Sequence, residues 1–151
     1  MGAKHDPPPL PPDVTYTSCY CEENAYLLCA TFSQNADVAA SWDVSVAFVS
    51  NARQTVALWS QKASRDLDGL VVWDYHVVLC LRSRARPVSP PSDSEARAFG
   101  KTTDSDSPAR TWIYDFDTRL GLPCDATGAC LRVSSYICYR LLWTCTTDMK
   151  V

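Results

Sequence analysis

The spacing of hydrophobic and polar residues predicts one helix followed by several strands. Residues 22–32 (EENAYLLCATF) carry apolar side chains at helical spacing behind two glutamates, a pattern typical of the first turns of a helix. Residues 44–49 (VSVAFV) and 55–59 (TVALW) are rich in β-branched and aromatic residues and predict two strands. We expect residues 50–53 to join these strands as a hairpin turn.

The most apolar segment is residues 70–81 (LVVWDYHVVLCL), which follows Gly69. A strand that is apolar along almost its whole length is typical of the centre of a sheet, where both faces are covered, and we expect that position for it. Strand character returns at residues 111–117 (TWIYDFD) and ends at Gly121. The sequence therefore predicts a mixed helix-and-strand domain.

Three segments lack this periodicity and set the domain limits. Residues 1–14 carry a proline cluster and are predicted to form a disordered tail. Residues 82–110 are rich in serine, threonine, proline and arginine, which predicts a disordered insertion. Residues 125–151 show no clean period and are predicted to be a C-terminal tail. A single domain over residues 15–124 suits a chain of 151 residues.

Charge and composition narrow the possible functions. A net charge of −3 gives no indication of nucleic-acid binding. No apolar run is long enough to span a membrane, and the N-terminal residues lack the apolar core of a signal peptide. We therefore expect a cytoplasmic or nuclear protein. The eight cysteines include no CxxC pair and the chain has two histidines, so we expect reduced, mostly buried thiols and neither metal nor cofactor.

Histidine is the usual general base near neutral pH, and only one of the two is held in place by its surroundings. His5 lies in the proline-rich tail, whereas His76 lies within the most apolar segment. A buried imidazole needs a hydrogen-bond partner. A histidine with a purely structural role in the core is the alternative interpretation of His76.

Two kinds of neighbour favour a catalytic role for this imidazole. Cys21 lies at the predicted start of the helix, where backbone N–H groups and the helix dipole favour a thiolate, and Cys19 is the nearest alternative. An acid beside the imidazole would fix its tautomer, and strand alternation places Asp115 and Asp117 on one face without choosing between them. Asp74 is a third candidate. The chain order is therefore a Cys at the start of a helix, a His on a strand and an Asp on a later strand. This order recurs in papain-like and transglutaminase-like enzymes.

Several short blocks resemble the protein N-terminal glutamine amidohydrolase family, which is characterised by a WDYHV motif. In chain order they are residues 16–29 (YTSCYCEENAYLLC), 47–51 (AFVSN), 58–59 (LW), 72–79 (VWDYHVVL), 113–118 (IYDFDT) and 122–124 (LPC). The combination of YCEEN with WDYHV is highly specific. Together the blocks cover the region from residue 16 to residue 124.

The resemblance implies a site, a fold and a reaction. By it, Cys21 is the nucleophile, His76 the base and Asp115 the orienting acid. The implied fold is of the α/β class (α+β type), with a papain/transglutaminase-like core in which the nucleophile-bearing helix packs on a mainly antiparallel sheet. The implied reaction converts the N-terminal glutamine of a protein or peptide to glutamate through a thioester, with release of ammonia, in the N-degron degradation pathway. We also expect a monomer that binds neither nucleic acid nor membrane.

The chain departs from the family pattern in two places. The family joins the histidine strand to the aspartate strand by a short turn, where this chain has residues 82–110. The family also continues beyond residue 124, whereas residues 125–151 do not resemble it, so we expect the C-terminal part of the family fold to be missing. The alternative is a catalytically inactive truncated form that binds at most peptides or partners. A redox-sensitive or metal-binding cysteine-rich protein is a more distant alternative.

Overall fold

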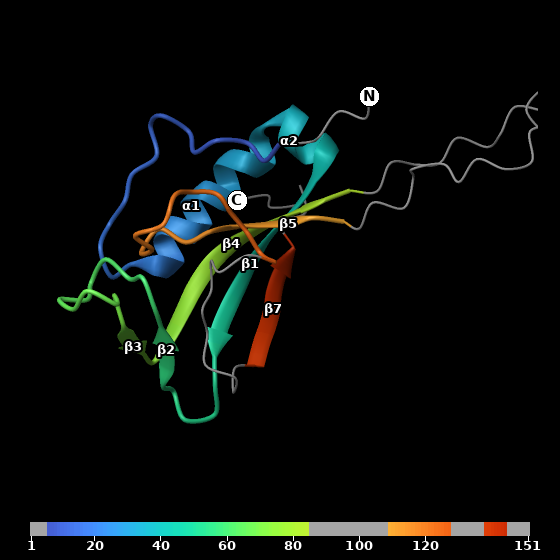
Figure 1. Cartoon of the computed structure of the whole chain (residues 1–151). Helices are drawn as coiled ribbons and strands as arrows, with labels where there is room; N and C mark the ends of the chain where they lie inside the picture. The colour runs from blue at the N-terminus through green and yellow to red at the C-terminus, as the bar shows by residue number, and fades with distance from the viewer. Residues whose placement is uncertain (1–5, 85–108, 128–137, 145–151) are drawn as a thin grey trace, which may run out of the picture.

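The computed structural model describes residues 6–84, 109–127 and 138–144, and the other residues lie outside this description (Figure 1). The elements in chain order are two helices followed by seven strands: α1 (Cys21–Gln34), α2 (Ala36–Ser41), β1 (Trp42–Ser50), β2 (Val56–Leu58), β3 (Val71–Trp73), β4 (Tyr75–Ser83), β5 (Thr111–Tyr114), β6 (Cys124–Asp125) and β7 (Cys138–Thr144). The helix predicted over residues 22–32 is confirmed as α1.

Five strands form one sheet in the order β6-β5-β4-β1-β7, and every neighbouring pair in it is antiparallel. β4 lies in the middle, as predicted from its apolar sequence. β2 and β3 form a separate two-stranded antiparallel sheet. Figure 1 shows α1 lying across one face of the large sheet and the β2–β3 pair near the end at which β4 begins. The predicted α+β arrangement with an antiparallel sheet is therefore confirmed.

The start of α1 is fixed by a side chain one turn into the helix. Tyr20 is the N-cap residue and offers no side-chain cap. Instead, the Asn24 side chain accepts a hydrogen bond from the Thr17 N–H (2.9 Å) and donates one to the Thr17 carbonyl (2.7 Å). Asn24 is 1% exposed, so this pair of bonds anchors the turn that precedes the helix to its buried face. Cys21 is thereby placed in the first turn of α1.

The main core fills the space between the helices and the sheet. Leu28, Cys29 and Phe32 of α1 are the apolar residues predicted to share one helix face, and all three are buried. The sheet residues that pack with them are Trp42, Val44, Leu79, Leu81 and Tyr114, together with Phe116 just beyond β5. Burial of side chains of this size is worth about 1.5–3 kcal/mol each, so this interface holds α1 on the sheet.

The segment predicted as one strand over residues 70–81 is two strands in two different sheets. β3 ends at Trp73 and β4 begins at Tyr75. Between them the exposed Asp74 accepts a hydrogen bond on its carboxylate from the N–H of Tyr75 (2.9 Å), a local bond typical of a turn. The prediction of a single strand was wrong because the run is apolar on both sides of Asp74, and hydrophobicity alone does not show where a chain passes from one sheet to another.

The predicted hairpin between residues 44–49 and 55–59 was also wrong. β1 pairs with β4 and β7, and β2 pairs with β3, so the two predicted strands belong to different sheets. The connection is a loop organised by Asn51, whose side-chain oxygen accepts from the N–H groups of Arg53 (3.0 Å) and Thr55 (3.1 Å). Turn-forming residues predicted the reversal of the chain correctly but not the partner of the next strand.

The proline-rich segment differs from the disordered tail predicted for residues 1–14. Residues 1–5 lie outside the description, but residues 6–14 are described and packed. Leu10 and Val14 lie against the main core, and the Tyr114 hydroxyl donates to the Pro8 carbonyl (2.5 Å). A segment without regular structure is ordered here because apolar side chains and one buried hydroxyl tie it to the sheet.

The predicted insertion and C-terminal tail lie largely outside the described residues, namely at 85–108, 128–137 and 145–151. Their described ends belong to the large sheet. Arg82 pairs with Thr111, and the Ser83 N–H donates to the Arg110 carbonyl (2.9 Å), so β4 and β5 extend into the segment predicted as an insertion. Asp125 pairs with Trp112, and β7 pairs with β1, so the segment predicted as a tail also adds strands.

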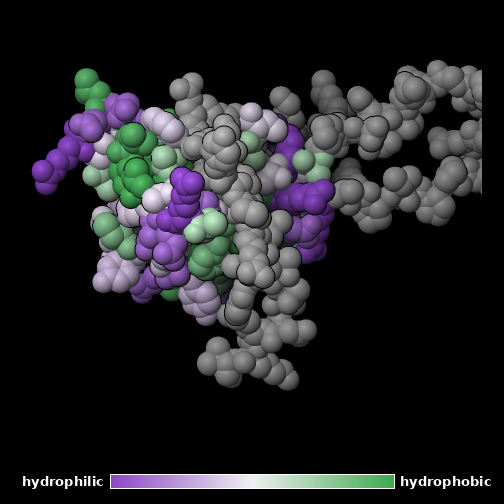
Figure 2. All heavy atoms as spheres, turned by 90° about the horizontal axis from the view of Figure 1, so that it is seen from below, coloured by the Kyte–Doolittle hydropathy of each residue, from purple (hydrophilic) through white to green (hydrophobic). Residues whose placement is uncertain are grey.

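The described surface mixes polar and apolar residues. Seen from below, hydrophobic residues gather at one side of the molecule, next to hydrophilic ones (Figure 2). The large apolar side chains that remain exposed are Tyr16, Tyr20, Tyr26, Leu27, Leu67, Leu70, Val72 and Leu120. Among the described helices, none combines the length and apolarity that a membrane crossing needs.

Candidate active site

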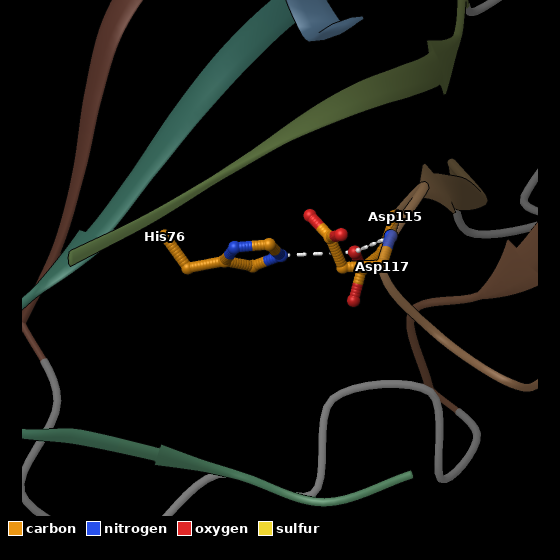
Figure 3. A group of neighbouring side chains, drawn as sticks. All are labelled: His76, Asp115 and Asp117. Carbon is orange, nitrogen blue, oxygen red and sulfur yellow. Dashed lines mark hydrogen bonds and ion pairs between the residues drawn. The ribbon is translucent and has the colours of Figure 1, made fainter. Parts of the chain in front are cut away.

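A buried imidazole–carboxylate pair lies at the start of β4. Nε2 of His76 and Oδ1 of Asp115 are 2.9 Å apart, and both residues are 0% exposed (Figure 3). His76 is the second residue of β4, and Asp115 directly follows β5. Because β4 and β5 are antiparallel neighbours, the start of one strand meets the end of the other and the two side chains point toward each other.

Three donors surround the carboxylate of Asp115. Oδ1 accepts from the Asp117 N–H (2.9 Å) as well as facing the imidazole, and Oδ2 accepts from Nε2 of Gln61 (3.2 Å). Asp115 lies in a turn closed by its own carbonyl and the N–H of Thr118 (3.2 Å). The expected sharing of one strand face by Asp115 and Asp117 was therefore wrong, because β5 ends at Tyr114.

Cys21 approaches the imidazole from the first turn of α1. It is half-buried, and its hydrogen bonding and charge are among the causes that raise the pKa of His76. Nδ1 of His76 is buried and has no partner that satisfies hydrogen-bond geometry. Since Nε2 is turned to Asp115, Nδ1 is the nitrogen left for Cys21. Catalytic hydrogen bonds are often poorly aligned when no substrate is bound.

The pair favours a charged imidazole. Burial lowers the pKa of His76, but hydrogen bonding to Asp115 and Cys21, followed by the charges of the same two residues, outweighs burial and raises that pKa to about 10. Burial also raises the pKa of Asp115. The hydrogen bond and charge of His76 outweigh burial, together with the hydrogen bonds from Gln61 and the Asp117 N–H, and the pKa of Asp115 is lowered. The site therefore holds an imidazolium–carboxylate pair at neutral pH.

An aromatic ring covers the imidazole. The indole of Trp73 stacks on the His76 ring with centroids 5.7 Å apart and an interplanar angle of 21°. A ring face attracts a cation, so this contact also favours the protonated imidazole. Trp73 is the last residue of β3 and His76 the second residue of β4, so the corner at Asp74 brings one ring onto the other.

The remaining acids have other partners. Asp117 is 1% exposed, and its Oδ1 accepts from the Tyr16 hydroxyl (2.6 Å). Figure 3 shows its carboxylate beside that of Asp115, at the same end of the imidazole. Asp74 is exposed and bonds only its neighbour Tyr75 in the described structure. The structure thus brings His76, Asp115 and Cys21 together and leaves Asp74 outside.

His76, Asp115 and Asp117 also have the spacing of a metal site, since one ligand atom from each lies within 4.8 Å of the others. However, Nε2 of His76 and Oδ1 of Asp115 are already hydrogen-bonded to each other, and Oδ1 of Asp117 is bonded to Tyr16. We therefore interpret the group as a hydrogen-bond network.

Other candidate residues from the sequence are less central. Cys19 is exposed just outside α1, and His5 lies outside the described residues. Cys29 is buried, and burial raises the pKa of Cys80 to about 11, which keeps that thiol protonated. Cys124 is disulfide-bonded, so the expectation of reduced thiols does not hold for it.

The raised pKa of His76 predicts a loss of stability in alkali. A base whose pKa is higher in the folded state stabilises the fold fully below its ordinary pKa of 6.5, and that contribution disappears as pH rises through about 10. We expect the free energy of unfolding to fall between these values with a slope approaching about 1.4 kcal/mol per pH unit, the slope for one proton. Thermal melts followed by circular dichroism from pH 6 to 10.5 would measure it.

The matched control for this titration is His76→Gln. The glutamine keeps a polar side chain but cannot titrate. The free energy of unfolding should therefore fall less steeply with pH, with only the slope that Cys80 and other groups contribute. An equal slope in both proteins would show that His76 does not carry the effect.

Comparisons with known proteins identify the family of this chain. The model of the N-terminal glutamine amidase family matches residues 16–136, past residue 124 where the sequence motifs end. Protein N-terminal glutamine amidohydrolase of Arabidopsis thaliana is 45% identical over 91 residues, covering 58% of this chain and 38% of that protein. The chain therefore belongs to the N-terminal glutamine amidase family.

Two further relatives with the same name extend the comparison. The Danio rerio protein is 37% identical over 109 residues, covering 72% of this chain and 42% of its own length. The Homo sapiens protein is 36% identical over 125 residues, covering 82% of this chain and 49% of its own length. The chain thus spans less than half the length of these curated relatives.

Gln61 is the site residue that the sequence analysis missed. It lies in the linker between β2 and β3, is 1% exposed, and donates to the acid of the central pair. No motif or hydrophobic period distinguishes a single glutamine in a linker, so only the structure reveals its contact with Asp115.

Proposed function

We propose that this chain is a hydrolase that deamidates the N-terminal glutamine of proteins or peptides to glutamate, with release of ammonia. The observation that carries the proposal is the buried His76–Asp115 hydrogen bond of 2.9 Å beside Cys21. Membership of the N-terminal glutamine amidase family supports the substrate class.

The proposed mechanism assigns one role to each residue. The Cys21 thiolate attacks the carbon of the side-chain carboxamide, and the His76 imidazolium gives its proton to the departing ammonia. The neutral imidazole then takes a proton from water, which hydrolyses the γ-glutamyl thioester and restores the thiol group. Asp115 holds the ring so that Nδ1 faces the sulfur, and it stabilises the imidazolium.

The proposal extends to the fold family and the cellular role. A nucleophile in the first turn of a helix that packs on an antiparallel sheet bearing the base supports a papain/transglutaminase-like core. We place the reaction in the cytosol or nucleus, as the step that prepares N-terminal glutamine for the N-degron pathway, and we propose that the chain acts as a monomer without a metal or cofactor.

The test is ammonia release from a short peptide that begins with glutamine, with conversion to glutamate confirmed by mass spectrometry. We expect turnover of this peptide and none of the same peptide with an acetylated N-terminus, since the proposed substrate carries a free α-amine. A cooperative thermal melt of the same sample establishes that the chain is folded.

The alternative is a catalytically inactive truncated form that retains at most peptide or partner binding. It is favoured by one observation, the coverage of less than half of each relative described above. A folded sample that releases no ammonia from the free peptide would overturn the proposed reaction and support this alternative.

A further inference from the structure

We propose that Gln61 is a positioning residue of the site, which fixes the carboxylate of Asp115 and through it the orientation of the His76 imidazole. The inference rests on the proposed function and adds a residue to it. In the described structure the Gln61 side chain donates hydrogen bonds to Asp115 and to the Trp59 carbonyl, so we infer that it acts on the reaction through Asp115.

The backbone of Gln61 is tied to the segment that follows Asp115. Gln61 and Thr118 form an isolated antiparallel bridge, and the Gln61 N–H donates to the Gly69 carbonyl (2.8 Å). Gly69 has φ +68°, and a Cβ there would lie 2.7 Å from the Cα of Ser60, so only glycine permits this approach. The linker and the turn that carries the acid are therefore held as one unit.

The direction of the Gln61 amide is set by its two neighbours. Nε2 lies 3.2 Å from Oδ2 of Asp115 and 3.4 Å from the carbonyl oxygen of Trp59. Both neighbours only accept hydrogen bonds, so the amide must present its NH2 group to them. Gln61 is thus a neutral donor aimed at a buried carboxylate.

This donor fixes the rotation of the Asp115 carboxylate about its Cβ–Cγ bond. Oδ1 of Asp115 is occupied by His76 and the Asp117 N–H, and Oδ2 is occupied by Gln61. With Gln61 replaced by an apolar residue, Oδ2 would be a buried anionic oxygen without its donor. The carboxylate would then lower its free energy by rotating. The imidazole would rotate with it, and Nδ1 would move away from Cys21.

The charged groups around this contact have opposite signs. The His76 imidazolium and the Asp115 carboxylate form the central pair, with Asp117 beside the carboxylate and Cys21 beside the ring. A neutral donor steadies the carboxylate without competing with His76 for its charge. The hydrogen bond from Gln61 is one of the contributions that lower the pKa of Asp115.

The first test compares Gln61→Leu with Gln34→Leu, which removes the same group from an exposed position at the end of α1. In peptide deamidation we expect Gln61→Leu to lower kcat by about tenfold to hundredfold with KM unchanged, because the ring is misplaced while the substrate site is intact. Gln34→Leu should behave as the unmodified chain.

Gln61→Glu gives a signature that a structural role alone would not produce. The introduced carboxyl group can still donate to Asp115 when it is protonated, whereas its ionised form repels Asp115, and two facing carboxylates share one proton. We therefore expect this variant to approach the activity of the unmodified chain at pH 6 and to lose it as pH rises, while Gln61→Leu stays low throughout. Parallel pH profiles of the two variants would overturn the proposal.

A second measurement needs no turnover. Iodoacetamide alkylates thiolates, and mass spectrometry separates Cys21 from the exposed Cys19, which serves as an internal reference. We expect Gln61→Leu and, above pH 8, Gln61→Glu to slow alkylation of Cys21 at least about fivefold relative to Cys19. Unchanged Cys21 reactivity in both folded variants would overturn the inference, even if the unmodified chain releases no ammonia and the proposed function fails.

Discussion

Replacing Cys21 by serine is expected to abolish ammonia release, lowering kcat by a factor of about 10⁴ or more. The half-buried sulfur of Cys21 is the proposed nucleophile, and a hydroxyl in its place is far harder to ionise than a thiol. Since serine differs from cysteine by one atom, the fold should be unaffected and the melting temperature should stay close to that of the unmodified chain.

Cys19→Ser is the matched control for this substitution. Cys19 lies two residues earlier, is exposed and faces Ser18, with the sulfur and the hydroxyl oxygen 3.6 Å apart. We expect this variant to retain activity within about twofold, because a surface substitution away from the site has little effect. Full activity in Cys21→Ser, or loss of activity in Cys19→Ser alone, would move the nucleophile to Cys19.

Asp115→Asn should have the second-largest effect, lowering kcat by about 10³–10⁴. The asparagine NH2 group would meet a donor wherever it pointed, because His76, Gln61 and the Asp117 N–H all face the present carboxylate. Without the acid the pKa of His76 should fall, so the imidazolium that is proposed to give its proton to the departing ammonia should be lost at neutral pH. Peptide deamidation and the pH profile of kcat would measure both effects.

Asp117→Asn is the control that separates the two neighbouring acids. Its side-chain oxygen can still accept from the Tyr16 hydroxyl, so we expect at most about a tenfold loss of kcat and an unchanged pH profile. If Asp117→Asn lowered kcat more than Asp115→Asn, Asp117 would be the orienting acid and the assignment of Asp115 would be wrong.

The sequence predicted local structure well where a single period dominated. The helical spacing of Leu28, Cys29 and Phe32 predicted α1, and these residues do form its buried face. The apolar run around His76 correctly predicted a central strand. Both features depend on burial, and burial is what hydrophobic periodicity reports.

The errors arose where partners distant in sequence decide the outcome. The corner at Asp74 separates two sheets although both sides of it are apolar. The order of residues 6–14 depends on Pro8, Leu10 and Val14 meeting the sheet, which proline content cannot predict. Pattern alone left Asp115, Asp117 and Asp74 open as the acid, and the resemblance chose Asp115, the residue that the structure joins to His76.

The β4–β5 pairing has a consequence for how this chain can vary in evolution. His76 is the second residue of β4 and Asp115 follows β5, whereas the chain leaves β4 at Ser83 and enters β5 at Thr111. At about 3.3 Å per residue, seven residues of β4 put that exit roughly 23 Å from the imidazole. The register from Leu79↔Tyr114 to Arg82↔Thr111 sets the distance of base from acid independently of the intervening length. A lineage can therefore lengthen or shorten that connection while the imidazole and carboxylate stay in register.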